Sequence, residues 1–216
     1  MIPAASTLPV YLKKRHAAWK ASDYKENSAW FHNLAAEGQH PRTMLVTCCD
    51  SRVPAVEIFG AEPGDLFVVR NVANLIPPHE PDHAHHGTSA AVEFAVNKLK
   101  VAHIVVIGHS GCGGVKACHD MCAGDAPELA EGPSYVGRWM DILRPGYETV
   151  VAKTEPGPER LAALEREAVK VSIRNLLTFP FVSEKLDEGT LSLAGAWFEI
   201  ATGDLLIYDP KTGGFA

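Results

Sequence analysis

The chain has 216 residues, with 20 basic against 26 acidic residues and a formal net charge of −6 at pH 7. This balance, without a long run of Lys and Arg, argues against a nucleic-acid partner, and the length suits one domain with a short appendage. The longest apolar run, near Ile104, is too short to cross a bilayer, so no membrane partner is expected. The N-terminal charges follow the apolar residues, the reverse of a signal peptide. With five cysteines, an odd number in a chain too long to depend on disulfides, a reduced, cytoplasmic protein is expected.

The N-terminal residues 1–38 form the first predicted element. From residue 8 the pattern is helical, with aromatic residues between charged ones, and "GQHPR" ends the helix because Gly and Pro break helices. Weak amphipathicity and a high aromatic content predict an arm that packs on a partner surface rather than on its own core. Residues 39–216 are expected to form one α/β domain that carries the functional site.

Predicted strands and helices alternate along the rest of the chain. Apolar runs predict three buried strands, at 43–49, 65–74 and 101–110. Helical patterns predict four helices, at 85–100, 113–122, 133–144 and 158–177. Thr88 or Ser89 can cap the first of these helices, and segments 190–200 and 205–209 flank the turn "ATGD" as a hairpin. We therefore expect an α/β fold, with a mostly parallel central sheet flanked by helices.

Two short stretches that each follow a predicted strand carry the chemistry, "TCCDSRV" (47–53) and "GHSGCGG" (108–114). Ligands collect beyond the carboxyl ends of parallel strands, at the point where the strand order reverses, so the two loops meet if their strands are neighbours there. A thiolate from the first loop, with His109 and Cys112 from the second, then makes a Cys2His set. That set suits zinc and leaves the fourth tetrahedral position open, as catalytic sites require.

Only one of the adjacent thiols Cys48 and Cys49 is expected to face the metal, because neighbouring side chains of a strand point to opposite faces. Cys48 is favoured, since Asp50 and Arg52 then share its side at two-residue spacing, and Cys49 is expected to pack as a small hydrophobe. Ionised Asp50 accepts hydrogen bonds only, so it could hold a zinc-bound hydroxide by its proton and aim a lone pair at a small electrophile. Arg52 would keep Asp50 ionised and fixed.

Three stretches together resemble the β-class carbonic anhydrases in order and spacing: "CCDSR" (48–52), "VVRNVAN" (68–74) and "VIGHSGCGG" (106–114). The resemblance implies the reversible hydration of CO2 to bicarbonate and a proton. It also implies a homodimer, with the active site at the dimer interface and the N-terminal arm around the partner. Many family members pair their dimers into a homotetramer.

The same resemblance implies the roles of individual residues. One Zn2+ per chain is expected on Cys48, His109 and Cys112, with Asp50 and Arg52 as the family's catalytic dyad. In some members the counterpart of Asp50 moves onto zinc as a fourth ligand and closes the site, a form expected here only at lower pH.

Further positions match the plant-like subgroup of this family. Gln39 matches a glutamine that binds substrate, Phe67 matches an aromatic wall, and Val72 and the backbone of Gly113 match the pocket lining. Phe94 is a departure, because the subgroup often has a tyrosine there. The missing hydroxyl removes one polar contact to bicarbonate and leaves the zinc chemistry unchanged.

Other functions are compatible with the same ligands. The site could hydrolyse carbonyl sulfide or carbon disulfide, which resemble CO2, or the chain could be a non-catalytic zinc-binding regulatory protein. A regulatory protein predicts a closed site or the loss of Asp50 or Arg52, and both residues are present. The stretch "CHDMC" (118–122) resembles a second metal site, but its helical spacing favours partly buried helix residues instead.

Overall fold

The computed structural model describes residues 6–80 and 86–216. The chain divides into two compact units, Met1–His40 and Pro41–Ala216. The division falls after His40, whereas the sequence analysis places the boundary after residue 38. Gln39 therefore belongs to the first unit and not to the unit that holds the sheet.

The first unit is helical, as expected. It contains α1 (Val10–Ala21), α2 (Asp23–Glu26) and α3 (Ser28–Glu37). The single predicted helix is interrupted at Ser22 and Asn27, whose side chains donate to the carbonyl oxygen four residues earlier and so compete with regular helix geometry. Trp19, Tyr24 and Phe31 form an aromatic cluster with ring centroids 5.2–5.7 Å apart. No residue of the three helices is buried, so these aromatic side chains remain available to a partner.

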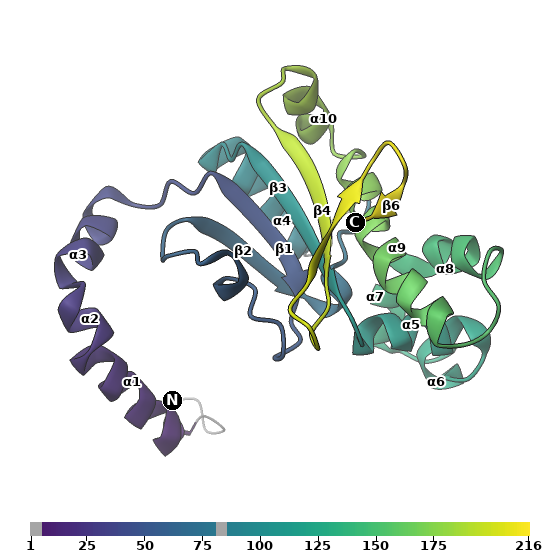
Figure 1. Cartoon of the computed structure of the whole chain (residues 1–216), viewed down its shortest axis with the longest axis horizontal. Coiled ribbons are helices and arrows are strands. Elements are labelled where there is room, and N and C mark those ends of the chain that lie inside the picture. The colour runs from purple at the N-terminus through teal and green to yellow at the C-terminus, as the bar shows by residue number, and fades with distance from the viewer. Residues whose placement is uncertain (1–5, 81–85) are drawn as a thin grey trace. The chain divides into compact units, whose positions relative to one another are not determined.

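A six-stranded sheet organises the second unit, in the order β2-β1-β3-β4-β5-β6 (Figure 1). The strands are β1 (Thr43–Cys48), β2 (Leu66–Asn71), β3 (His103–His109), β4 (Ser192–Phe198), β5 (Leu205–Asp209) and β6 (Gly214–Phe215). The first four in chain order are parallel, β4 and β5 form the expected antiparallel hairpin, and β6 pairs with β5. Because β1 lies between β2 and β3, the strand order reverses at β1, which is where open α/β sheets hold their ligands.

Helices and short turns connect the strands. They are η1 (Glu57–Phe59), η2 (Val72–Asn74), α4 (Gly87–Glu93), the π-helix η3 (Phe94–Leu99), α5 (Gly113–Ala123), α6 (Pro127–Ala130), α7 (Tyr135–Met140), η4 (Asp141–Leu143), α8 (Arg144–Val151), α9 (Pro158–Leu176) and α10 (Pro180–Asp187). The sequence analysis does not anticipate α6, α8 or α10. Within the described ranges, no helix combines the length and the apolar character needed to span a membrane.

The predicted cap of the helix at 85–100 is wrong. The helix is split into α4 and η3, its N-cap position is His86, and no side chain caps it. Thr88 is buried, and its hydroxyl oxygen instead accepts a hydrogen bond from Asn71 Nδ2 at 3.2 Å. The hydroxyl is therefore used to tie the helix to the end of β2.

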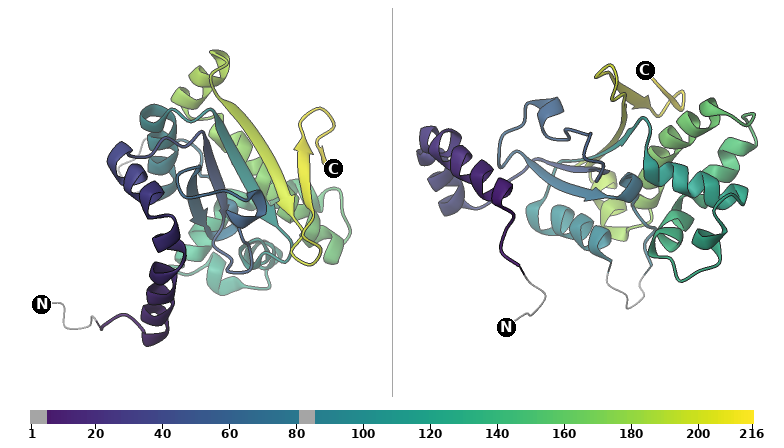
Figure 2. Two further views of the ribbon diagram at one scale, coloured as in Figure 1. Left: turned by 60° about the vertical axis from the view of Figure 1, so that its left-hand side comes forward. Right: turned by 90° about the horizontal axis from the view of Figure 1, so that it is seen from below.

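The core lies on both faces of the sheet and beyond its carboxyl edge. On one face, Met44, Val46 and Ile104 are buried against α4, η3, α9 and α10, as the two-residue period of a strand requires. Beyond the ends of the strands, α5, α7 and α8 gather beside α9 around a second apolar cluster (Figures 1 and 2). Cys48 and Cys112 belong to this second cluster, so these two thiols lie in an apolar environment.

Gly195 of β4 determines how closely α9 can pack on the sheet. A Cβ atom at this position would lie 2.7 Å from Val169 Cγ1 and 2.8 Å from Ile173 Cδ1, both on α9. We predict that Gly195→Ala lowers the free energy of unfolding by about 1–3 kcal/mol, the usual cost of overpacking, as measured by urea unfolding. Gly87→Ala is the control, because a Cβ there meets nothing within 4 Å, and it should change stability by less than about 0.5 kcal/mol. Equal stability of both variants would contradict the close contact between α9 and β4.

Candidate metal centre

Three side chains from two loops meet at the carboxyl edge of the sheet. Cys48 is the last residue of β1, His109 is the last residue of β3, and Cys112 is the N-cap residue of α5. Their ligand atoms lie within 4.8 Å of one another, and the two sulfur atoms are 3.9 Å apart. All three residues are buried. The predicted adjacency of the two loops is therefore confirmed, because β1 and β3 are hydrogen-bonded parallel neighbours.

Of the two adjacent thiols, the structure brings Cys48 into this group. Cys49 is exposed, and its backbone N–H donates to the carbonyl oxygen of Asn71. The expectation that Cys49 packs as a small hydrophobe is wrong. The strand has ended at Cys48, so the next side chain points to solvent rather than into the opposite face of the sheet.

The second loop turns sharply because glycine allows it. Gly111 has a φ of +64°, in the left-handed region that favours glycine, and this turn carries the chain from β3 into α5. A Cβ at Gly108 would lie 2.9 Å from Val169 Cγ2 and 3.2 Å from the carbonyl oxygen of Glu165. Glycine therefore lets α9 lie directly against the end of β3 at the level of the ligands.

The donor set fits a metal ion. His109 Nδ1 lies 3.0 Å from the carbonyl oxygen of Ser110, which can only accept, so Nδ1 carries the proton and Nε2 a lone pair. Within residues 6–80 and 86–216, this buried Nε2 has no hydrogen-bond partner. A buried nitrogen lone pair without a donor, next to two sulfur atoms, is what a tetrahedral zinc site with nitrogen and sulfur ligands presents.

The pKa shifts of the two thiols also favour a cation at this position. The hydrogen bond from Cys112 lowers the pKa of Cys48 and outweighs the burial that would raise it. The same hydrogen bond and burial raise the pKa of Cys112. Burial lowers the pKa of His109, but its interactions with Cys48 and the Ser110 carbonyl raise it to above the ordinary value. A divalent cation held between the two sulfur atoms would allow both thiols to ionise.

Asp50 and Arg52 form a bidentate ion pair beside the three candidate ligands. Arg52 Nε donates to Asp50 Oδ1 at 3.0 Å and Nη2 donates to Oδ2 at 2.7 Å, while Asp50 Oδ2 lies 4.0 Å from His109 Nε2. The Arg52 side chain, and then its backbone N–H, hold the pKa of Asp50 well below its usual range. Arg52 also donates to the carbonyl oxygen of Gly111 at 2.9 Å, which joins the two loops. Its side chain is 54% exposed and that of Asp50 17%, so the pair is accessible from solvent.

Two further residues hold the loops, and sequence reasoning missed both. Arg70 of β2 donates to the carbonyl oxygens of Cys48 at 2.9 Å, Asp50 at 2.7 Å and Val53 at 3.1 Å. Glu165 of α9 accepts the backbone N–H of Cys112 at 3.0 Å. A signal was present for Glu165 only, because it stands beside the apolar stripe of a long helix, where an acid is unusual.

The remaining candidates lie at different distances from the ligands. Val72 begins η2, and its side chain would lie 2.6 Å from a Cβ at Gly114, so the turn after β2 touches the start of α5 beside Gly113. Phe67 and Phe94 instead stack on each other, with ring centroids 5.9 Å apart. Phe67 pairs with Met44 of β1, four residues before Cys48 and about 13 Å back along the strand. These two rings therefore do not adjoin the metal group of their own chain.

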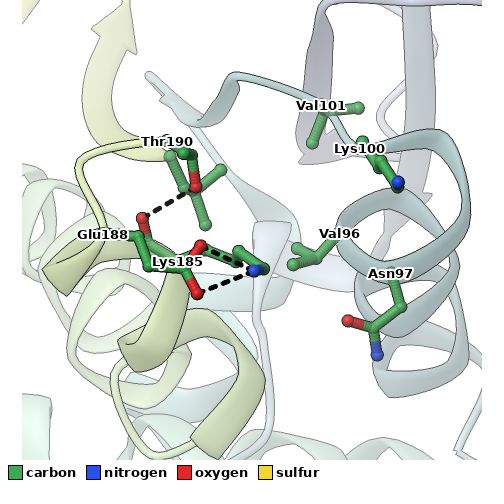
Figure 3. A pocket seen from close by; sticks show the side chains of 8 residues that line it. Val96, Asn97, Lys100, Val101, Lys185, Glu188 and Thr190 are labelled. Carbon is green, nitrogen blue, oxygen red and sulfur yellow. Dashed lines mark hydrogen bonds and ion pairs between the residues drawn. The ribbon is translucent and has the colours of Figure 1, made fainter.

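A separate hollow lies near the amino ends of the strands, which is the opposite edge of the sheet. It has a volume of about 240 Å³, and Figure 3 shows Lys185 and Glu188 on one side of it and Val96 and Val101 on another. The ammonium of Lys185 is paired with the Glu188 carboxylate. None of the described residues that line the hollow is a cysteine or a histidine, and none belongs to the metal group. Cys118 and Cys122 join no metal-binding group within the described part of the chain either.

A Cys2His group at the switch point of a parallel α/β sheet offers three ligand atoms to one metal ion. A family model described as carbonic anhydrase matches residues 43–205 of this chain. The Arabidopsis thaliana protein named beta carbonic anhydrase 5, chloroplastic, is 35% identical over 189 residues, which are 87% of this chain and 60% of that protein. The chain belongs to the β-carbonic anhydrase family.

Solved structures agree with this assignment. The β-carbonic anhydrase CcaA is 31% identical, with a TM-score of 0.85 over 95% of this chain and 90% of that one. The β-carbonic anhydrase CafA of Aspergillus fumigatus is 30% identical, with a TM-score of 0.77 over 94% and 93% of the two chains. Two tetrameric β-carbonic anhydrases of Sordaria macrospora are represented by a structure that is 30% identical, with a TM-score of 0.74 over 91% and 94%.

We predict that Cys48→Ser abolishes stoichiometric zinc binding, because it removes one of three buried ligands, whereas Cys49→Ser retains it. Both variants change a thiol to a hydroxyl at neighbouring positions, so each is the matched control for the other. Zinc per chain, measured by mass spectrometry of the purified proteins, gives the answer. The reverse result would assign the ligand to Cys49.

Proposed function

We propose that the protein catalyses the reversible hydration of CO2 to bicarbonate and a proton. One Zn2+ per chain would be held by Cys48, His109 and Cys112. The observation that carries this proposal is the convergence of three buried ligand atoms within 4.8 Å, with the Asp50 carboxylate 4.0 Å from His109 Nε2. When bound, zinc supplies a Lewis acid that makes a water nucleophilic near neutral pH.

Asp50 would orient the nucleophile. An ionised carboxylate accepts hydrogen bonds only, so Asp50 holds the proton of the attacking oxygen and aims its lone pair at CO2. Arg52 keeps Asp50 ionised through the two-pronged contact, and its bond to the Gly111 carbonyl fixes the dyad relative to Cys112. Since both Asp50 oxygens are engaged by Arg52, we propose the open form of the site, with Asp50 off the metal. Asp50 as a fourth ligand would require this contact to break.

A partner copy would complete the substrate pocket. Phe94 is 44% exposed and stacks on Phe67, away from the ligands of its own chain. We propose that this pair and Gln39 line the site of a second copy, while Val72 and the Gly113 backbone line the site of their own chain. The aromatic cluster of the arm, residues 1–38, has no buried member, and it supports a homodimer in which the arm contacts the partner. Pairing of dimers into a tetramer is compatible with the Sordaria macrospora relatives, which are tetrameric.

A cytoplasmic location stays part of the proposal. Its support is the odd number of cysteines, five, in a chain too long to depend on disulfides, as expected in a reducing compartment. The named location of the Arabidopsis thaliana relative is the chloroplast, and the present chain spans 60% of that protein's length.

The dyad is tested by Asp50→Asn. The amide keeps the size of the side chain but removes the ionised acceptor, so we predict that zinc stays bound while CO2 hydration falls by about 10²–10⁴-fold in stopped-flow assays. Asp141→Asn is the matched control, because Asp141 forms a similar exposed ion pair with Arg144 away from the ligands, and its activity should equal that of the wild type. Wild-type rates in Asp50→Asn would remove Asp50 from the mechanism. Zinc without CO2 turnover in the wild type would direct the same assay to carbonyl sulfide and carbon disulfide.

The shared pocket is tested by mixing two inactive chains. Phe94→Asp places a carboxylate where bicarbonate would bind, and we predict at least about a tenfold loss of activity. Co-expressed with Cys48→Ser, it should recover about a quarter of the wild-type activity, because half of random dimers are mixed and each contains one complete site. No recovery, with mixed dimers verified by tagged purification, would place Phe94 outside the partner's site.

A further inference from the structure

Glu165 is a buried acid that makes direct contact with the backbone of a ligand. Its side chain lies on α9, the residue is 3% exposed, and Oε1 accepts the N–H of Cys112 at 3.0 Å. Cys112 is the N-cap residue of α5, and its own side chain makes no capping hydrogen bond to that helix. The contact resembles the backward bond of a capping box, in which a carboxylate binds the N–H of the N-cap residue, but here the carboxylate comes from another helix.

The turn that carries Cys112 requires such a tether. Glycines stand on both sides of the residue, Gly111 with a φ of +64° and Gly113 at the start of α5, so the local backbone has a wide choice of conformations. Arg52 holds the Gly111 carbonyl at 2.9 Å, and Glu165 holds the Cys112 N–H. The two bonds hold the oxygen and the N–H of one peptide group, the one that joins Gly111 to Cys112, and so restrict where the Cys112 sulfur can lie.

The tether is anchored on a rigid element. α9 has 19 residues, and it approaches β3 so closely that a Cβ at Gly108 would lie 3.2 Å from the carbonyl oxygen of Glu165. The backbone of Glu165 is thus fixed against the strand that ends in His109. Glu165 therefore links the position of Cys112 to β3, the strand that ends in His109.

Glu167, two residues further along α9, is a second buried acid, but its carboxylate has different partners from that of Glu165. It is also buried, at 4% exposure, but its carboxylate pairs with Lys170 and Arg174. Among the described residues Glu165 has no such ion pair, and its Oε1 accepts a hydrogen bond from the backbone of the ligand Cys112 instead. Burying a carboxylate without a cation is costly, so its contact with Cys112 is a specific feature rather than general packing.

We propose that Glu165 is a positioning residue, whose carboxylate oxygen holds the Cys112 N–H and so places the Cys112 sulfur for metal binding together with Cys48 and His109. This inference rests on the metal group of the proposed function. The position of the accepting oxygen matters most. An oxygen within hydrogen-bond distance of the Cys112 N–H keeps the Cys112 sulfur in place, and an oxygen moved away from it does not. Partners behind the ligands typically contribute 10–100-fold to metal affinity.

Two variants separate the acceptor position from the charge. Glu165→Gln keeps an acceptor oxygen at the same side-chain length and removes the charge, whereas Glu165→Asp keeps the charge and withdraws the oxygen by about 1.5 Å, one carbon–carbon bond. Competition with a chelator should give a zinc dissociation constant within about threefold of wild type for Glu165→Gln and about 10–100-fold weaker for Glu165→Asp. The thiolate-to-cobalt absorption bands of the Co2+-substituted protein should shift in Glu165→Asp only.

Glu167→Asp is the matched control, since it makes the same change at a buried acid on the same helix, and it should leave zinc affinity and the cobalt spectrum unchanged. Wild-type affinity and spectrum in Glu165→Asp would overturn the proposal. So would an equal weakening in Glu165→Gln, which would make charge the cause, or in Glu167→Asp, which would make general packing the cause. A wild-type protein that binds neither zinc nor cobalt would instead refute the metal group itself, and this inference with it.

Discussion

The parallel pairing of β1 with β3 is the constraint on which the rest of the site depends. Each strand ends in a ligand, Cys48 and His109, and adjacent strands lie about 4.8 Å apart, so the two side chains can converge only if the strands are neighbours and end together. The tight turn at Gly111 then returns the chain to the same place and adds Cys112. Sheet topology brings together residues that are 64 positions apart in sequence.

Side-chain to backbone hydrogen bonds fix these loop ends. Arg70 binds three carbonyl oxygens of the first loop, Arg52 joins the first loop to the second, and Glu165 binds the second from α9. Two guanidinium groups and one carboxylate thus bind backbone groups of the two loops. The result is a site whose ligands are held by their backbones, with the Asp50 carboxylate beside them, 17% exposed and paired with Arg52.

The sequence predicts the elements that depend on local pattern. Apolar runs identify β1, β2 and β3, the turn "ATGD" identifies the hairpin, and the two-residue alternation favours Cys48 over Cys49, the choice that the geometry also makes. What it misses depends on contacts between distant segments. Thr88 fails as a cap because its hydroxyl is bound to Asn71, and the contact of Glu165 with Cys112 crosses 53 positions. No local rule reports such a contact, although an acid beside the apolar stripe of α9 hints that it has a buried partner.

The most direct test of the account is X-ray absorption at the zinc edge of the purified wild-type protein, because it counts ligands by element. The account predicts about one zinc per chain, with two sulfur atoms near 2.3 Å and two light atoms, one of them an imidazole nitrogen, near 2.0–2.1 Å. A first shell without sulfur, or with four sulfur atoms, would contradict the convergence of Cys48, His109 and Cys112. A protein purified with no zinc and unable to take it up would contradict the metal centre altogether.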